Sequence, residues 1–363
     1  MDIIDPRIET LTVTYNSITY PISYFTPAIK IEGITDEAYP DWAVGTTFAK
    51  EDFCIIPELK RKYKSVADGN VGNFPAIKGS AHWVDYGAIN SYLMFATDQD
   101  IGATTTGTDV LLEFDFSTAT AIAGVDISFE SAHVMLIDTL GIIYKSDYVA
   151  LTSYSIDDAV VYAEKLWVSL QNTNVGNTPD TSPSFWVEAP ERVYFSETIS
   201  GTDFGCATFE GYFFDPIVVN TRSILTDLYW LPSSILRLKM TGETKLSTIC
   251  LGVTESLGAT IVGAKLRHES TSKFKISEFT GFKEILRYGK VRLLEGEVIY
   301  DTERFGYTSQ IADRIMDRNI IWIPTTEDKF SEAISLGYIE QLEIPMEVAT
   351  KTKSNVRIVG INK

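Results

Sequence analysis

The chain carries one motif twice, and this repeat limits how the chain folds. Residues 63–84 read YKSVADGNVGNFPAIKGSAHWV, and residues 167–187 read WVSLQNTNVGNTPDTSPSFWV. Each copy has an aromatic residue, Asn-Val-Gly-Asn starting seven residues later, a Pro, and then Trp-Val. An agreement of this length indicates that one small module is used twice. We therefore expect a chain built of modules rather than a single enzyme-like domain.

The centre of the motif is typical of a tight turn. Glycine adopts positive φ angles, Asn tolerates them, and Pro fixes the exit of the turn. A module of about 40 residues has little room for a core, so one large aromatic must supply much of it. We expect Trp83 and Trp186 to fill that role.

Composition excludes several classes of protein. With 363 residues, the chain has room for two to four domains. Its net charge of −18 disfavours nucleic acid and anionic membrane as general partners. Three cysteines without a CxxC pair predict neither a disulfide framework nor a zinc site, and no cofactor is expected. The acidic N-terminus is unlike a signal peptide, and no run of about 18 apolar residues predicts a membrane span.

One stretch departs from the acidic average. Residues 265–292 contain eight Lys or Arg and three Glu, a local charge of +5. One interpretation is a solvated strand face. The other is a basic face that docks on an acidic neighbour, such as another copy of the chain. The candidate interface residues are Lys265, Arg267, Lys273, Lys275, Arg287, Lys290 and Arg292.

Most of the chain reads as β structure. Leu112, Phe114 and Phe116 alternate with polar residues, and the same period recurs at 125–129 and 236–240. Alternation of this kind places one face on a core and the other in water. It predicts a mainly β fold with an antiparallel sandwich.

The order of the segments predicts five parts. They are an N-terminal arm (1–36), the first module (37–87), a β-sandwich (88–151 and 207–262), the second module inserted into it (152–206), and a C-terminal β-barrel or sandwich (263–363). In the last part, Thr308 is expected to cap a helix at about 309–318, where Ile311 and Ile315 share one side. Residues 320–323, IIWI, predict a buried strand.

The repeated module resembles the small chitin-binding-like carbohydrate-binding modules of families 5 and 12. The matching residues are Trp42, Gly45, Tyr63, Pro75 and Trp83 in the first copy, and Tyr154, Trp167, Pro179 and Trp186 in the second. Sugar-binding members of these families expose a pair of aromatics just after the central one. Here those places hold KSVA at 64–67 and VSLQ at 168–171. The resemblance therefore leaves Tyr63, Trp83, Trp167 and Trp186 as either glycan contacts or core residues of the module.

At the end of the first module, the stretch 83–90, WVDYGAIN, is followed by YLMF at 92–95. This order resembles the joint between such a module and a β-sandwich in structural proteins of tailed-bacteriophage tails and baseplates. The resemblance implies a galactose-binding-like sandwich and a tail-tube-like C-terminal part. It also implies a location in the virion, after assembly in the host cytoplasm without a signal peptide.

Catalytic signatures are weak. The sequence lacks GxSxG, HExxH and a glycine-rich phosphate loop. His82, His133 and His268 have no second His at ligand spacing, so we expect structural or surface roles. The acidic pairs at 157–158 and at 98 and 100 are typical of solvated turns, although the second pair has ligand types for a structural calcium.

Three hypotheses follow from the sequence. The first is a virion structural subunit, not an enzyme, that assembles in a tail or baseplate ring with copies of itself and other tail proteins. The second is a host-surface glycan-binding protein of the tail, which requires an accessible ring face at Tyr63 or Trp167. The third is a glycoside hydrolase with binding modules, which requires two carboxylates across a cleft.

Overall fold

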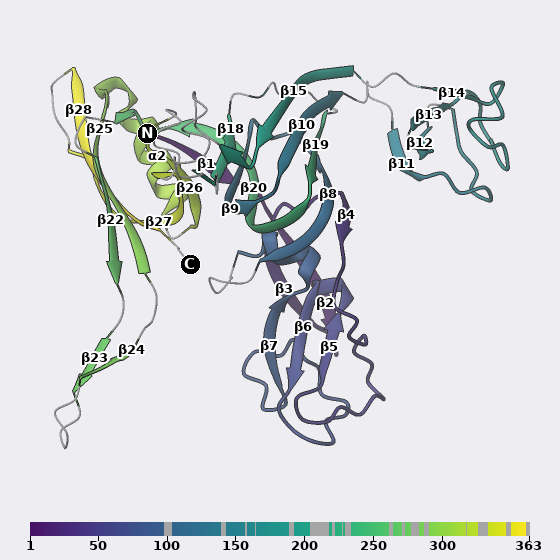
Figure 1. Cartoon of the computed structure of the whole chain (residues 1–363), viewed down its shortest axis with the longest axis horizontal. Coiled ribbons are helices and arrows are strands. Elements are labelled where there is room, and N and C mark those ends of the chain that lie inside the picture. The colour runs from purple at the N-terminus through teal and green to yellow at the C-terminus, as the bar shows by residue number, and fades with distance from the viewer. Residues whose placement is uncertain are drawn as a thin grey trace, which may run out of the picture.

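The structure is a computed structural model of the whole chain (Figure 1). The residues it describes are 1–97, 104–138, 143–156, 158–163, 165–188, 192–203, 218–219, 222–226, 228, 234–260, 264–270, 273–276, 283–286, 290–316, 318–325, 333–345 and 350–360. These residues are mainly in strands, with one α-helix and a few 3-10 turns among them. Nearly all strand pairs are antiparallel, so the expected fold class is confirmed.

A sheet of 15 strands runs through the body of the molecule. Its first part contains β4 (Lys30–Ile34), β8 (Thr105–Asp115), β9 (Ala121–Ser128), β10 (Ser131–Asp138), β15 (Arg192–Ser200), β18 (Arg222–Leu225), β19 (Ser234–Thr241) and β20 (Glu243–Ser256). The first residues of β20 pair with β8 and later ones with β9, so this part folds over on itself. The alternating residues Leu112, Phe114 and Phe116 enter the shared core with Val134 and Leu251.

The first strand joins this sandwich to the C-terminal part. Strand β1 (Asp2–Pro6) lies between β20 and β26 (Ile320–Ile323) and pairs with both. Its side chains alternate, so Ile3 and Ile4, both fully buried, enter different cores. Residues 1–36, which the sequence grouped as an arm, form four strands, β1 to β4, among them the hairpin of β2 (Ile8–Tyr15) and β3 (Ile18–Phe25).

The C-terminal part completes the sheet. Its strands are β21 (Ala259–Thr260), β22 (Lys265–Ser270), β25 (Lys290–Asp301), β26, β27 (Ser335–Glu343) and β28 (Lys351–Gly360). A 3-10 turn, η3 (Thr302–Arg304), leads into the helix α2 (Phe305–Ile315). As expected, the IIWI strand β26 is entirely buried.

Helix α2 begins and ends earlier than the sequence suggested. Thr308 was expected to cap it but lies in its first turns and is buried. Thr308, Ile311, Ala312 and Ile315 are all buried and follow the three- and four-residue spacing of one helix face. Burial of this face, rather than a side-chain cap, therefore sets the position of the helix.

The two repeated modules form small sheets of their own. The first has β5 (Phe53–Ile56), η1 (Pro57–Leu59), β6 (Arg61–Ser65) and β7 (Trp83–Ala88), and η2 (Asn90–Phe95) follows it. The second has β11 (Ile143–Asp147), β12 (Asp158–Tyr162), β13 (Lys165–Ser169) and β14 (Trp186–Glu188). Figure 1 shows both projecting from the body on different sides.

Two short pairs of strands complete the described elements. They are β16 (Thr202–Asp203) with β17 (Val218–Val219), and β23 (Lys273–Ile276) with β24 (Lys283–Leu286). The second pair continues the direction of β22 and β25 away from the body (Figure 1). In the part of the chain that the structure describes, no helix has the length and apolar character needed to cross a membrane.

Candidate binding surfaces

The repeated motif forms a buried hydrogen-bond network in the first module. The Asn70 side-chain amide donates to Ser65 Oγ and to the His82 carbonyl, each at 3.1 Å. The Asn73 amide donates to Asn70 Oδ1 at 2.9 Å, and the Asn73 carbonyl accepts from Trp83 Nε1 at 2.9 Å. Asn70 and Ser65 are almost completely buried. The network therefore satisfies polar groups that would otherwise be costly inside so small a module.

The second module repeats every one of these bonds. The Asn174 amide donates to Ser169 Oγ and to the Phe185 carbonyl, each at 3.1 Å. The Asn177 amide donates to Asn174 Oδ1, and Trp186 Nε1 donates to the Asn177 carbonyl, both at 2.8 Å. The glycine between the two Asn residues has a positive φ in both copies, which explains why that position holds glycine. The motif is thus a requirement of the module fold.

The structural repeat is longer than the sequence motif. The Trp42 N–H donates to the Ile55 carbonyl, and at the same place Tyr148 donates to Val161. Asp41 and Asp147 pair with those same two residues in parallel register. We therefore call residues 41–88 copy 1 and residues 147–188 copy 2.

This equivalence changes one match made from the sequence. Tyr154 was matched with Trp42, but Tyr154 bridges Asn174 as Phe48 bridges Asn70. Tyr154 and Phe48 also meet the closing Trp at similar distances, 5.2 and 5.1 Å between ring centroids. The counterpart of Trp42 is Tyr148, which lies before the shared motif and was therefore missed.

The four aromatics singled out by the sequence lie in or against the module cores. Tyr63, Trp83 and Trp186 are at most 3% exposed. Trp167 is half-buried against the core of copy 2, and its Nε1 donates to the Tyr162 carbonyl at 3.2 Å. Tyr63 offers no ring face for a sugar, and Trp167 stands without a second exposed aromatic at the stacking position.

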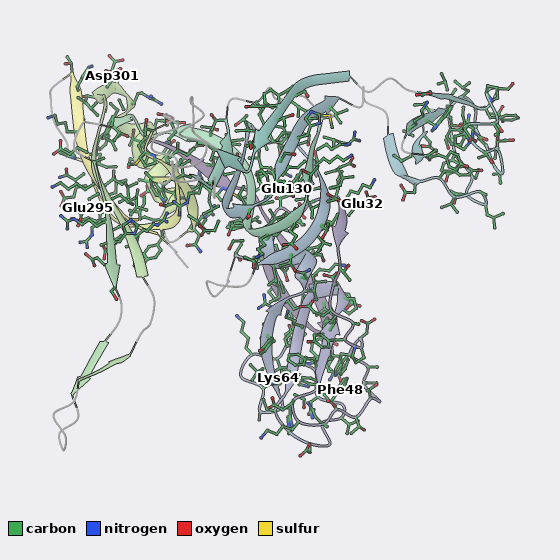
Figure 2. The ribbon with its side chains drawn as sticks, in the orientation of Figure 1. Glu32, Phe48, Lys64, Glu130, Glu295 and Asp301 are labelled. Carbon is green, nitrogen blue, oxygen red and sulfur yellow. The ribbon has the colours of Figure 1, made fainter. Side chains whose placement is uncertain are left out.

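A different aromatic cluster lies on the outer face of copy 1. The Tyr39 and Phe53 rings stack at 4.8 Å, and Tyr86 meets Phe53 edge-on at 5.0 Å. Lys64, which is labelled in Figure 2, has its Nζ 5.6 Å from the Phe53 ring and 5.9 Å from the Tyr86 ring, and it pairs with Glu51. The hydrogen bond to Glu51 raises the pKa of Lys64. Tyr39 and Tyr86 are 37% and 56% exposed, so this cluster is an open aromatic surface.

Sequence reasoning missed this aromatic cluster. The signal was the spacing in β7, where Tyr86 lies three residues after the buried Trp83 and is exposed. Copy 2 lacks the cluster, because Ala159 and Val168 occupy the paired positions of Phe53 and Lys64.

Copy 2 exposes larger aliphatic side chains on two neighbouring loops, where copy 1 exposes Val44, Val66 and Val71. The loops contact each other through the Gly176 N–H, which donates to the Ala150 carbonyl at 2.9 Å, and through the Ile156 N–H, which donates to Asn172 Oδ1 at 3.1 Å. We call their exposed residues the aliphatic tip: Val149, Leu151, Ile156, Leu170 and Val175. Leu151 is 92% exposed.

The basic stretch, residues 265–292, comprises β22, the two-stranded pair of β23 and β24, and the start of β25. We call these residues the basic ribbon. Lys265 and Arg267 are exposed on β22, and Arg267 pairs with Glu295 at 3.3 Å (Figure 2). His268 lies opposite Arg292 on β25. For Lys273, Lys275 and Lys290 the structure describes the backbone alone, and Arg287 lies outside the described residues. Within the described residues, β22 pairs only with β25, so its other edge is open.

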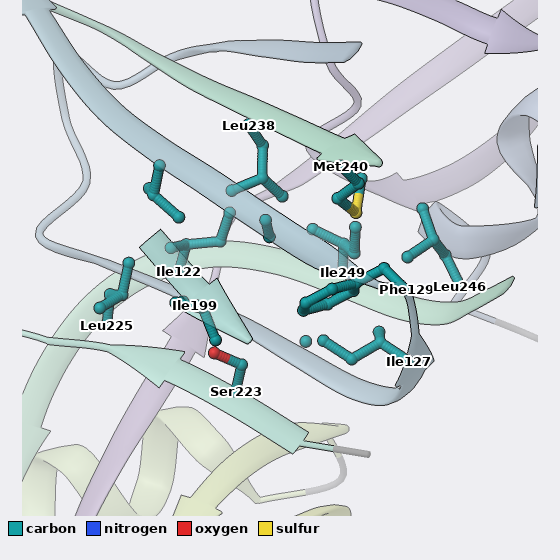
Figure 3. A pocket seen from close by; sticks show the side chains of 13 residues that line it. Ile122, Ile127, Phe129, Ile199, Ser223, Leu225, Leu238, Met240, Leu246 and Ile249 are labelled. Atoms are coloured by element: carbon teal, nitrogen blue, oxygen red, sulfur yellow. The ribbon is translucent and has the colours of Figure 1, made fainter. Parts of the chain in front are cut away.

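A small apolar cavity lies between the two layers of the sandwich (Figure 3). Its volume is about 30 Å³, and its lining includes Phe129, Met240 and Ile249. Ligand pockets are usually larger by roughly tenfold or more. We interpret the cavity as a packing void of the core.

The remaining titratable candidates are dispersed. His133 Nε2 lies 2.8 Å from Ser196 Oγ on the neighbouring strand, and Asp158 Oδ2 accepts from the Ser155 N–H in a turn. Asp98, Asp100 and Asp157 lie outside the described residues. Among the residues that are described, no three His, Cys, Asp or Glu side chains are grouped as a metal site would need.

Comparison with known proteins gives no relative. No protein-family model, curated protein or solved structure matches the chain.

Proposed function

We propose that the chain is a structural subunit of a tailed-phage virion, a tail or baseplate ring component that acts by protein–protein assembly. Its partners in this proposal are copies of itself and other tail proteins. The sandwich is then of the galactose-binding type and the C-terminal part is tail-tube-like. The order of motifs at 83–95 supports the proposal, together with the division into a continuous body and projecting elements.

The observation that carries the proposal is the basic ribbon. Strand β22 is exposed on nearly all its residues, and in the described part of the chain its outer edge is unpaired. An open edge is a template for pairing with another chain, and the two-stranded β23–β24 pair of the ribbon is marginally stable by itself. With a local charge of +5 on a chain of −18, the ribbon suits an acidic protein surface.

The test is the state of association of the whole purified chain. We expect light scattering and native mass spectrometry to show a defined oligomer at low ionic strength that weakens as salt is added, because salt screens surface charges. Negative-stain images should show closed rings. A stable monomer at every concentration and ionic strength would overturn the proposal.

A second candidate function is glycan binding by the aromatic cluster of copy 1. Pyranose rings stack on exposed aromatic faces, and Tyr39 and Tyr86 offer such faces beside the charged pair of Lys64 and Glu51. We expect glycan-array binding by the whole chain to fall at least tenfold in Tyr86→Ala. The matched control is Val187→Ala, an exposed position of copy 2. Silence of the unaltered chain on the array, or binding that survives Tyr86→Ala, would reject this candidate.

A further inference from the structure

The aliphatic tip of copy 2 has no counterpart of equal hydrophobicity in copy 1. At the positions of Val149, Leu151 and Ile156, copy 1 has Ala43, Gly45 and Lys50, as the shared turn hydrogen bonds show. Both copies fold around the same internal network, so the module does not need large aliphatics at these places. Exposed aliphatics that folding does not require mark a surface that another molecule covers.

The net charge of copy 2 restricts the partner. Copy 2 contains six Asp or Glu and one Lys, a charge of −5, whereas copy 1 has six acidic and six basic residues and is neutral. A partner that covers the tip must be apolar enough to bury Leu151 and basic enough to balance the net negative charge of copy 2.

The chain itself contains a segment with these properties. The ribbon carries +5, and its outer strands combine Lys with apolar residues: β23 reads KFKI, in strict alternation, and β24 reads KEIL. Among the described residues, β23 and β24 pair only with each other. Copy 2, which carries the tip, and the ribbon therefore have opposite charges of equal size, and both contain apolar side chains.

One chain does not bring these two surfaces together. The sheet of copy 2 shares no strand with the body sheet, and Figure 1 shows copy 2 at the opposite end of the molecule from the ribbon. Contact between them requires two molecules. A contact between unlike surfaces of identical chains repeats head to tail, so it produces a ring if it closes and a filament if it does not.

We propose that the aliphatic tip of copy 2 docks on the basic ribbon of a second copy of this chain. This inference rests on the proposed assembly function and names the two surfaces that would mediate it. Because the surfaces differ, each subunit uses its tip toward one neighbour and its ribbon toward the other.

The test replaces the tip with the residues that copy 1 already has at the same places. The variant Val149→Ala, Leu151→Gly, Ile156→Lys should fold, because the module tolerates these residues in copy 1. We expect its self-association to weaken at least tenfold in sedimentation or native mass spectrometry. The control, Val66→Ala with Val71→Ala, trims exposed aliphatics of copy 1 and should associate like the unaltered chain. Hydrogen exchange of copy 2 checks that the tip variant is folded.

A mixing experiment tests the head-to-tail geometry. A ribbon variant, Lys273→Glu with Lys275→Glu, should also fail to self-associate. In a mixture of the two variants, the ribbon variant supplies an unaltered tip and the tip variant supplies an unaltered ribbon. The two should therefore form a 1:1 dimer that does not grow further. Oligomers that persist in the tip variant, or a mixture that stays monomeric, would overturn the inference while leaving the proposed assembly function intact. Only a monomeric unaltered chain counts against that function.

Discussion

The two copies of the module share an interior and differ almost everywhere else. The network of Asn70 and that of Asn174 have the same donors and acceptors, with distances that agree within 0.1 Å. Their outer faces have diverged into an aromatic cluster in copy 1 and an aliphatic tip in copy 2. The repeated Asn, Gly and Trp residues maintain the fold, whereas most residues of the two outer surfaces differ between the copies, and function is to be sought on those surfaces.

The copies also differ in what supports them. The β2–β3 hairpin packs on copy 1, where Tyr15 stacks on Phe74 at 4.5 Å and Tyr20 meets the same ring at 5.2 Å. Among the residues that the structure describes, the aromatics in the core of copy 2 all belong to copy 2 itself, such as Tyr148 and Tyr154. Copy 1 is therefore a buttressed module and copy 2 is close to an independent one.

The largest effect is expected from removing the closing tryptophan. Trp83→Ala and Trp186→Ala should each cost about 3–5 kcal/mol of local stability. A module this small has a low free energy of unfolding, so copy 2 should unfold completely. Copy 1 should keep part of its exchange protection, because the β2–β3 hairpin packs on it. Hydrogen exchange followed by peptide mass spectrometry reads both modules in one sample. Equal loss of protection in the two variants would contradict the claim that the hairpin supports copy 1.

The next effect concerns Phe74, a core residue of copy 1 that the hairpin covers. Phe74 is 3% exposed and lies directly after Asn73, while the residue after Asn177 is the half-buried Thr178. Phe74→Ala should destabilise copy 1 by about 3 kcal/mol, since it empties a buried aromatic site. Thr178→Ala, the matched change, should stay within about 0.5 kcal/mol. Urea titrations that follow each module by exchange would measure the difference, and similar values for both would show that the hairpin contributes little.

A thiol probe compares how often each module opens. Cys54 is fully buried in copy 1, and burial raises its pKa to about 12, so the folded module presents almost no thiolate at pH 8. Cys54 pairs with Tyr63 on the neighbouring strand. Its counterpart in copy 2 is Val160, which pairs with Trp167 in the same way and is also fully buried. With Cys206 and Cys250 changed to Ser, labelling of Cys54 should be at least tenfold slower than labelling of Val160→Cys in a Cys54→Ser chain. Faster labelling of Cys54 would reverse the order of stability that we infer.

The sequence predicted the parts of the fold that depend on local pattern. Period-two alternation located strands such as β8, and the apolar run of β26 located a buried one. It did not predict that β1 joins two parts of the molecule, because its pairing with β20 depends on residues about 250 positions away. Nor did it place the start of α2, because packing of Thr308 against the core overrides its capping preference.

The candidate surfaces were harder to predict than the fold. The repeat made Trp83 and Trp186 candidates for glycan contact or for the module core. Both are buried, so they are repeated because the interior of the module requires them. The aromatic cluster joins Tyr39, Phe53 and Tyr86 from separate segments, and only the strand pairing brings them together. The two copies differ at the positions of the cluster, for example Phe53 in copy 1 and Ala159 in copy 2. Such differences indicate the cluster only when the structural equivalence of the two copies is known.

The smallest effect concerns the joint between copy 1 and the sandwich. Glu37 accepts a hydrogen bond from Lys62 of β6 and, at 3.0 Å, from the Asn90 N–H at the start of η2. Burial alone would raise the pKa of Glu37, but the hydrogen bonds from Lys62 and the backbone outweigh it, so the pKa is lowered. A carboxyl whose pKa is lower in the folded state stabilises it above the unfolded pKa, and this contribution is lost as pH falls through the folded value.

We therefore expect acid to loosen η2 while copy 2, with Ile143 at the equivalent position, gains no such sensitivity. Exchange protection of Asn90–Phe95, corrected for the intrinsic effect of pH, should fall a few-fold between about pH 6 and pH 3. Glu37→Gln keeps the shape and removes the titration, so the variant should be less protected at neutral pH and nearly flat across this range. Asp36, which accepts from the Ser91 N–H at 2.7 Å, is unchanged in both chains, so the difference between them reports Glu37. If Glu37→Gln responded to pH like the unaltered chain, the pH sensitivity of η2 would come from other groups. Glu37 would then not distinguish copy 1 from copy 2.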